Sequence, residues 1–242
     1  TLDEAHRGRS RLAFEELLFV HMLHTRARAL SRTARQGIRY ENRRNLTSKL
    51  KASLPFKLTT AQVRATREIV RDMTSAERMH RLLQGDVGSG KTAVAAYAML
   101  LAAAHGHQAA LVAPTEILAE QHHRVLADLL KGSDLELRLL TGSVADAERE
   151  AIVAGLARGS THLVVGTHAV LEGGVAFRSL AVAVIDEQHR FGVHQRLALQ
   201  AKGGGGGANV LVMTATPIPR TLLMTHYGDL DVSRLKIGRA HV

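Results

Sequence analysis

The stretch of sequence that decides the fold is Gly85-Asp86-Val87-Gly88-Ser89-Gly90-Lys91-Thr92. It fits the pattern G-x-x-x-x-G-K-[ST], in which glycines let the backbone turn tightly and aim its N–H groups at phosphate oxygens. An apolar run precedes it and strong helix formers follow it, which disfavours the alternative of a chance glycine turn. This P-loop predicts a nucleotide site at the start of a helix, where Lys91 reaches the β- and γ-phosphates and Thr92 ligates Mg²⁺.

The composition allows a sizeable core and contains no membrane span. Of the 242 residues 45% are apolar, and no apolar run approaches the ~18 residues that a spanning helix needs. There is no cysteine, which excludes disulfides and thiolate metal sites and fits a cytoplasmic protein. The chain starts at Thr1 without an initiator methionine or a signal-like stretch, so we expect a fragment of a longer protein.

The positive charge is concentrated near the N-terminus. The formal net charge is +10, and residues 1–51 hold twelve basic and five acidic residues, a net charge of +7. Such a basic arm favours a polyanion partner, most simply nucleic acid, although a solvated arginine-rich helix is an equal alternative. Aromatic residues make up only 3% and tryptophan is absent, so we expect contacts with the phosphate backbone and no base-stacking platform.

The N-terminal third of the chain predicts two helices. Residues 3–36 read as a long basic helix that stops near Gly37, and Thr59 or Thr60 can cap a second helix that runs to about Met73. The long helix carries a discontinuous apolar face among its arginines: Leu12, Leu17, Leu18, Leu23 and Leu30, with Arg7, Arg11, Arg26, Arg28, Arg32 and Arg35 elsewhere.

From residue 79 onward the sequence predicts alternating strands and helices. Several of the strands are continuous apolar runs, which is typical of parallel strands buried on both faces. Alternation of this kind after a P-loop predicts a doubly wound α/β domain. The expected strands are 79–84, 109–113, 135–140, 162–166, 181–185 and 210–214, and the expected helices are 91–104, 116–130, 145–158, 194–201 and 218–226.

Two acidic residues complete the predicted site. Asp186 and Glu187 follow the apolar strand 181–185, and open α/β sheets bind ligands at the carboxyl ends of their strands. We therefore expect both beside the P-loop, where Asp186 holds Mg²⁺ opposite Thr92 and Glu187 polarises the attacking water. The alternative is an acidic pair that only caps the next helix. His122 and His123 are expected to be a surface pair.

These motifs together resemble the RecG-type ATP-dependent DNA helicases of superfamily 2. A P-loop, an Asp-Glu-x-His box and a later Thr-Ala-Thr segment form the signature of the superfamily. The narrower resemblance covers about residues 3–236. It is carried by Leu54-Pro55-Phe56-x-Leu58-Thr59-x-x-Gln62, the P-loop, the segment 113–122 (APTEILAEQH), Gly166-Thr167-His168-Ala169, the segment 186–196 (DEQHRFGVHQR) and the segment 214–221 (TATPIPRT).

The resemblance implies a role for each motif. Lys91, Asp186 and Glu187 match catalytic residues; Gln62 matches a glutamine that reads the adenine edge, with Phe56 near the base. A plain polar residue on a helix is the alternative for Gln62. Two further groups match by position: the DNA-backbone contacts Pro114, Thr115, Gly166 and Thr167, for which simple strand-end turns are the alternative, and the residues that couple hydrolysis to domain motion, Gln188, His189, Thr214, Ala215 and Thr216.

The resemblance also implies the organisation of the chain. Residues 1–53 correspond to a basic linker helix and connector, and 54–236 to the first RecA-like, ATP-binding motor domain. We expect residues 237–242 to be a non-native tail on separate grounds, because they match what a common sequencing adapter would encode. The implied protein is a monomeric motor that uses ATP and Mg²⁺ to remodel stalled forks and Holliday junctions in recombination and repair, with no membrane partner. We expect the chain by itself to be inactive, because such motors hydrolyse ATP between two domains. The alternatives are a transcription-repair coupling translocase, which usually carries Asp-Glu-Glu-Gln at 186–189, and a non-catalytic ATP- or DNA-binding fragment.

Overall fold

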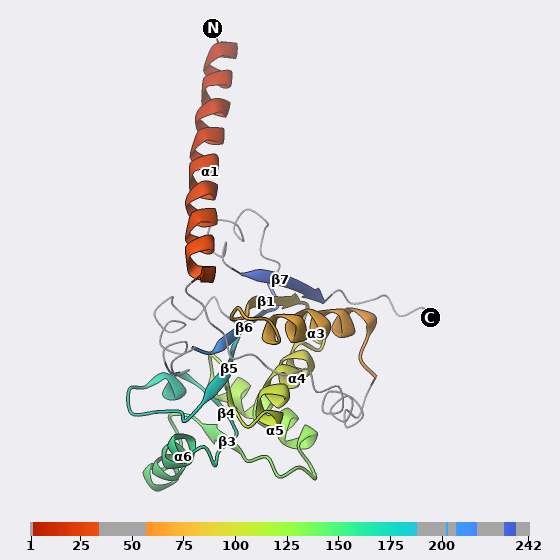
Figure 1. Ribbon diagram of the computed structural model, residues 1–242, viewed down its shortest axis with the longest axis vertical. Helices are drawn as coiled ribbons and strands as arrows, with labels where there is room; N and C mark the ends of the chain where they lie inside the picture. Colours follow the sequence, from red (N-terminus) through yellow and green to blue (C-terminus); the bar gives the residue numbers. More distant parts are fainter. Residues whose placement is uncertain (1, 34–56, 188–201, 203–206, 217–229, 236–242) are drawn as a thin grey trace.

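A seven-stranded sheet forms the centre of the computed structural model, which describes residues 2–33, 57–187, 202, 207–216 and 230–235 (Figure 1). The strands lie side by side in the order β3-β4-β2-β5-β6-β1-β7, and every neighbouring pair is parallel. The predicted parallel α/β sheet is therefore confirmed. The strands are β1 His80–Gly85, β2 Gln108–Val112, β3 Leu137–Leu140, β4 Leu163–Gly166, β5 Leu180–Asp186, β6 Asn209–Thr214 and β7 Asp231–Leu235.

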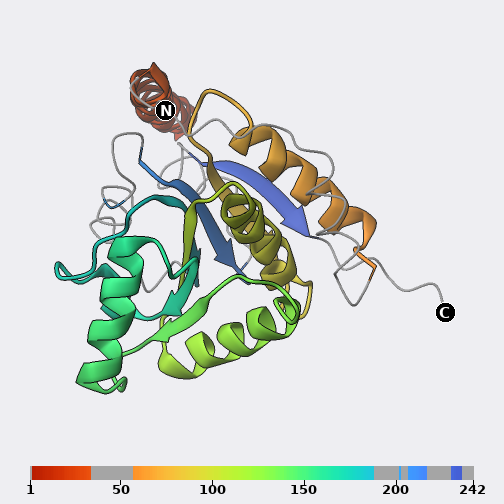
Figure 2. The same cartoon turned by 60° about the horizontal axis from the view of Figure 1, so that its bottom comes forward.

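Helices cover both faces of the sheet (Figure 2). Leu111 packs into a core shared with α3, α4 and α5, whereas its neighbour Val112 packs into a second core shared with α6 and η1. The alternation follows from the two-residue period of a strand, which sends successive side chains to opposite faces. The helices are α3 Thr60–Met73, α4 Lys91–Ala104, α5 Glu116–Leu129, α6 Asp146–Arg158 and the 3-10 turn η1 His168–Leu171.

From residue 59 onward, the predicted elements agree with the structure to within two residues wherever the structure describes them. All seven residues of β5 are buried, which explains the continuous apolar sequence from which this strand was predicted. Strand β7 and the turn η1 were not predicted, because β7 has three polar residues in five and η1 is only four residues long. The expected helices 194–201 and 218–226 lie outside the described residues.

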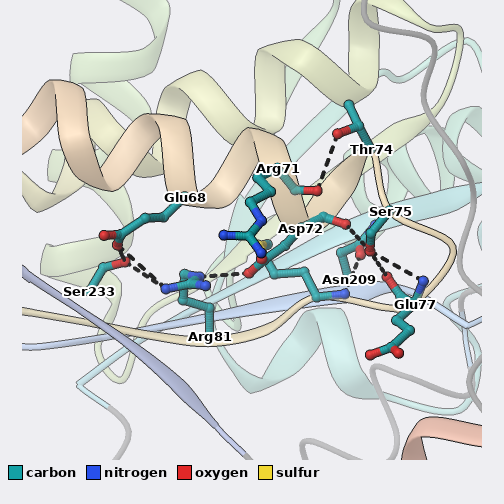
Figure 3. Close-up of polar contacts among 10 residues, drawn as sticks. Glu68, Arg71, Asp72, Thr74, Ser75, Glu77, Arg81, Asn209 and Ser233 are labelled. Atoms are coloured by element: carbon teal, nitrogen blue, oxygen red, sulfur yellow. Dashed lines mark hydrogen bonds and ion pairs between the residues drawn. The ribbon is translucent and has the colours of Figure 1, made fainter.

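A buried arginine ties β7 and α3 to β1 (Figure 3). Arg81 Nε lies 2.7 Å from Asp72 Oδ2, and its Nη1 lies 2.9 Å from Ser233 Oγ and 3.5 Å from Glu68 Oε2. Ser233 on β7 donates its hydroxyl hydrogen to Glu68 on α3, which closes the network. A buried guanidinium needs such partners because an unpaired buried charge is costly. The network therefore fixes α3 against the strand that leads into the P-loop.

Helix α1, Leu2–Thr33, extends away from this body (Figure 1). Of its expected apolar side chains, Leu12, Leu17 and Leu18 are exposed, and those of Leu23 and Leu30 are outside the described set. Phe14 and Phe19 are exposed as well. None of the described helices is both long enough and apolar enough to cross a membrane.

Candidate nucleotide-binding site

Three neighbouring strands deliver the predicted site to one edge of the sheet. The P-loop follows β1, Thr214-Ala215-Thr216 lies at the end of β6, and Asp186 with Glu187 lies at the end of β5. Strand β6 pairs with both β1 and β5, so the three carboxyl ends are adjacent. This is where ligands bind in open parallel sheets. The structure thus brings together motifs at residues 85–92, 186–187 and 214–216, which are far apart in the sequence.

The P-loop is wrapped around the ammonium group of Lys91. Lys91 Nζ donates to the carbonyl oxygens of Gly85, at 2.7 Å, and Asp86, at 3.0 Å. Gly90 caps α4 with φ of 81°, a left-handed conformation that glycine adopts without strain. An ammonium group has three donors, and the two carbonyls use two of them. The lysine is therefore held at the N-terminus of α4 with donor capacity toward an anion.

Gln62 contacts this loop from α3. Its side chain and that of Thr59 form a capping box, with Thr59 N donating to Gln62 Oε1 at 2.9 Å and Gln62 N donating to Thr59 Oγ1 at 3.3 Å. Gln62 Nε2 also donates to the carbonyl of Ser89 at 2.9 Å. A Cβ atom on Gly90 would overlap this amide nitrogen, so a larger residue there would displace the Gln62 side chain from the Ser89 carbonyl. The adenine role of Gln62 stays a prediction, and Phe56 lies outside the described residues.

His122 joins the site, which contradicts the expectation of a surface pair. It is buried, its Nε2 lies 2.6 Å from Asp186 Oδ2, and its Nδ1 lies 3.5 Å from Thr92 Oγ1. His123 is half-buried, and burial lowers the pKa of its imidazole. A signal for His122 was present in the sequence, because it shares a helical face with Ala119 and Leu126, three residues before and four after, and both are buried.

Glu187 has an unusual backbone conformation. Its φ is 50°, the left-handed region that residues other than glycine seldom adopt. Its N–H donates to Met213 O at 3.0 Å and to Asp186 Oδ1 at 3.1 Å, which holds it in place. Its Oε1 accepts from the Ala215 N–H at 3.3 Å. Strain of this kind persists where the surroundings enforce it, commonly at active sites.

The segment that holds Glu187 is itself ordered by its own hydroxyl groups. Thr214 Oγ1 and Thr216 Oγ1 lie 2.8 Å apart, and the Thr216 N–H donates to Thr214 Oγ1 at 3.2 Å. Gln84 Nε2 donates to the Thr216 carbonyl at 3.2 Å, which links this segment to β1. The glutamate, the threonines and the strand before the P-loop therefore form one connected group. The other expected coupling residues, Gln188 and His189, lie outside the described residues.

The oxygen atoms at this edge suit Mg²⁺. Thr92 offers a hydroxyl oxygen and Asp186 a buried carboxylate, and His122 contacts both. Mg²⁺ prefers oxygen ligands and is usually held by one or two carboxylates together with substrate phosphates. Among the described residues, no group of three or more histidine or acidic side chains could hold a metal alone. The arrangement therefore fits a cation shared between protein and nucleotide.

The predicted DNA-contact residues occupy the other half of the same edge. Thr115, at the start of α5, accepts from the Leu118 N–H at 3.3 Å, and the Ala113 N–H donates to the Gly166 carbonyl at 2.8 Å. A Cβ atom on Gly166 would overlap the Leu140 carbonyl oxygen, so β3 and β4 approach closely there. Pro114 is half-buried, whereas Thr167 is buried and its hydroxyl has no hydrogen-bond partner in the described part of the chain.

Comparison with known proteins identifies the family. The sequence profile of the family described as DEAD/DEAH box helicase matches residues 59–225. Two relatives named ATP-dependent DNA helicase RecG are similar: that of Streptococcus pneumoniae is 47% identical over 96% of this chain and 34% of its own length, and that of Escherichia coli K12 is 50% identical over 94% and 33%. The chain thus spans about a third of these relatives.

Solved structures agree with the sequence comparison. A structure of RecG bound to a three-way DNA junction has a TM-score of 0.83 and 41% identity, covering 98% of this chain and 31% of that one. The DEAD-box helicase Mss116 bound to single-stranded RNA is 17% identical with a TM-score of 0.62, covering 81% and 43%, and shows the fold alone. The resemblance to RecG-type helicases drawn from the motifs is confirmed, and the chain belongs to the DEAD/DEAH box helicase family.

Proposed function

We propose that this chain binds Mg-ATP and forms the ATP-binding half of a motor that moves along branched DNA. The observation that carries this proposal is the placement of Lys91 and Thr92, which follow β1, and of Asp186 and Glu187, at the end of β5, on either side of the end of β6. The names of the similar relatives support an ATP-driven DNA helicase, and the RecG structure with a three-way junction supports branched DNA as the substrate class.

Each side chain has a defined task in this proposal. Lys91 turns its ammonium toward the β- and γ-phosphates, while the N-terminus of α4 supplies backbone N–H groups. Thr92 and Asp186 would hold Mg²⁺, which when bound supplies charge neutralisation on the phosphates. Glu187 orients the attacking water and accepts its proton. The Ala215 N–H, which donates to Glu187 Oε1 at 3.3 Å, would hold that carboxylate in place.

The threonine segment at the end of β6 is proposed to report the state of Glu187. The Ala215 N–H holds the Glu187 carboxylate, so a movement of Thr214–Thr216 would release or recapture the catalytic group. Gln84 connects the same segment to the strand before the P-loop. A single shift of this segment would therefore change the contacts of both Glu187 and Gln84, the second of which lies on the strand that leads into the P-loop.

Duplex DNA is proposed to contact the strand ends beside the nucleotide. Pro114 and Thr115 follow β2, which pairs with β5 and so lies beside its acidic residues. Gly166 ends β4 and Thr167 follows it, one strand further along the sheet. Backbone N–H groups and hydroxyls suit contact with phosphates that ignores base sequence. Because the Thr167 hydroxyl is buried, its main chain is the better candidate for this contact. The two halves of one sheet edge would then hold the two ligands of the motor.

The first prediction tests nucleotide binding in the 242-residue chain. Lys91→Ala removes the side-chain cation of the P-loop, and hydrogen bonds to charged groups contribute about 1.5–3 kcal/mol, so we expect roughly 10- to 100-fold weaker binding of Mg-ATP. Isothermal titration calorimetry measures the Kd. The control is Lys131→Ala, an exposed lysine that pairs with Asp128 and lies after α5. Equal Kd values for wild type and Lys91→Ala would contradict the proposed function.

A further inference from the structure

A buried histidine bridges the two residues that are proposed to ligate Mg²⁺. His122 comes from α5, which contributes none of the P-loop or acidic-box residues. Its Nε2 is 2.6 Å from Asp186 Oδ2 and its Nδ1 is 3.5 Å from Thr92 Oγ1, the outer limit of a hydrogen bond. The side chains of His122 and Asp186 are only 10% and 9% exposed. Water therefore competes little for these contacts.

We propose that His122 is a positioning residue that orients the Asp186 carboxylate and the Thr92 hydroxyl toward a bound Mg²⁺. The proposal rests on the nucleotide function proposed above, and it assigns to His122 no contact with nucleotide or metal. The competing explanation is a histidine that only fills space in the core. The two differ in what they predict for metal affinity, because only orientation of the ligands changes the response to Mg²⁺ selectively.

The first part of the argument concerns the carboxylate. The terminal torsion of an aspartate is soft, so the plane of its oxygens is set by hydrogen bonds. His122 contacts Oδ2, and the Glu187 N–H donates to Oδ1 at 3.1 Å. With one donor on each oxygen the plane of Asp186 is fixed, and each oxygen keeps a further lone pair. Removing the histidine leaves one oxygen of a buried carboxylate without this donor.

The second part concerns the hydroxyl. A threonine oxygen that binds a cation must direct its hydrogen elsewhere, because the lone pairs face the metal. A carboxylate only accepts hydrogen bonds, so contact with Asp186 requires an imidazole hydrogen on Nε2, and in the neutral ring Nδ1 is then an acceptor. Nδ1 is the atom that faces Thr92. One ring thus donates to the first ligand and can accept from the second, which is a common arrangement around bound metals.

The helix keeps the ring in this place. Ala119 and Leu126 lie on the same face of α5 as His122 and are fully buried against the sheet. Thr115 caps the helix at its start, so α5 begins at a defined residue. An imidazole on a buried helical face has little freedom left to lose, which suits a group that orients others. His123, one residue further, lies on a different face and is only half-buried.

The test uses the 242-residue chain and ADP as the probe, with Mg²⁺ varied against an EDTA reference. We expect His122→Leu to raise the Mg²⁺ concentration for half-maximal ADP binding about 10- to 100-fold, the usual cost of losing a partner of a metal ligand. Affinity for ADP in EDTA should stay within ~2-fold, because the P-loop contacts are unchanged. His123→Ala is the matched control on the same helix and should leave both quantities unchanged.

Two amide variants keep the proposal testable if His122→Leu does not fold, which thermal unfolding of each variant reveals. His122→Gln places an N–H donor near the position of Nε2 and should retain most of the Mg²⁺ response. His122→Asn is too short to reach Asp186 and should lose it. The proposal is overturned if the Mg²⁺ midpoint is unchanged in His122→Asn or in folded His122→Leu. It is also overturned if these variants lose ADP affinity equally with Mg²⁺ and in EDTA. Failure of the wild-type chain to bind ADP at all would instead overturn the proposed function.

Discussion

At the amino edge of the sheet, Gln108 directs its whole amide to the main chain of its own domain. Its Nε2 donates to the carbonyls of Leu156, at 2.9 Å, and Thr161, at 2.8 Å, and its Oε1 accepts from the Ser179 N–H at 2.9 Å. At the carboxyl edge, Lys91 uses two donors on the P-loop and has a third. Both residues are anchored by backbone groups, yet only the second keeps capacity for a ligand.

The same contrast separates Asn209 from Asp186. Asn209, at the start of β6, accepts from the Met79 N–H at 2.7 Å and donates to the Ala181 carbonyl at 3.1 Å, which joins three neighbouring segments. Asp186, at the end of β5, accepts one hydrogen bond on each oxygen and retains lone pairs at an edge where three motifs meet. Polar groups at the amino edge thus stabilise the fold, and those at the carboxyl edge are available for chemistry.

The largest expected effect lies at the carboxyl edge. Glu187→Gln keeps the size of the side chain but removes its ability to accept a proton, and general-base catalysis contributes about 10²–10⁴-fold in rate. We expect ATP turnover to fall by that factor while Mg-ATP affinity stays within ~3-fold. Turnover is measured with the chain fused to the second motor domain of a similar RecG helicase.

The unfolding free energy of Glu187→Gln provides the control, because a residue with φ of 50° could also matter to the fold. An unchanged free energy of unfolding together with a large loss of turnover would support a chemical role for the carboxyl edge. Retained turnover, or a loss of turnover that follows from reduced stability, would contradict that role. In either of those cases the acidic pair at the end of β5 would have a structural role like that of Asn209.

A smaller effect, on stability, is expected at the amino edge. Asn209→Ala leaves the Met79 N–H and the Ala181 carbonyl buried without the side chain that pairs them. Each unpaired group should lower the free energy of unfolding by about 1–3 kcal/mol. Urea unfolding should show this loss, while the Kd for Mg-ADP of the folded protein stays within ~2-fold. Gln121→Ala, an exposed change on α5, is the control and should shift stability by no more than ~0.5 kcal/mol. Weaker nucleotide binding in folded Asn209→Ala would contradict the separation of the two edges.

The sequence predicted the elements that leave an unambiguous pattern. Strand β5 is a run of apolar residues because both of its faces are covered, and the P-loop glycines meet backbone requirements that few other residues satisfy. Parallel strands after a P-loop then place Asp186 near Thr92 by topology alone. The fold and the position of Asp186 at the carboxyl end of β5 were therefore predictable from local pattern and general rules.

The parts that were not predicted depend on contacts between distant residues. Strand β7 owes its place to pairing with β1 and to Ser233, which meets Arg81 152 residues earlier in the chain. His122 was taken for a surface residue because a histidine pair on a helix is commonly exposed, and its partner Asp186 is 64 residues away. The helical spacing of Ala119, His122 and Leu126 indicates burial, but the identity of the partner needs the fold.

The smallest expected effect concerns pH and the amino edge. His107 precedes β2 and its Nδ1 lies 2.7 Å from Ser179 Oγ. Burial, and secondarily the charge of His105, lower the pKa of the His107 imidazole below its ordinary value of about 6.5. The unfolded chain then takes up a proton that the folded chain resists, so the contribution of His107 is complete above about pH 6.5 and is lost as the pH falls below that value.

His107→Gln should therefore flatten the decline in unfolding free energy between about pH 7 and pH 5, which urea unfolding at several pH values measures. Burial lowers the pKa of His123 on α5 in the same direction, so the double variant with His123→Gln should flatten it further. Neither change should alter the Kd for Mg-ADP at pH 8, where both imidazoles are neutral in either state. An unchanged pH slope in His107→Gln would show that this residue does not stabilise the amino edge through its buried neutral form. A change in Kd at pH 8 would show that the two edges of the sheet are coupled.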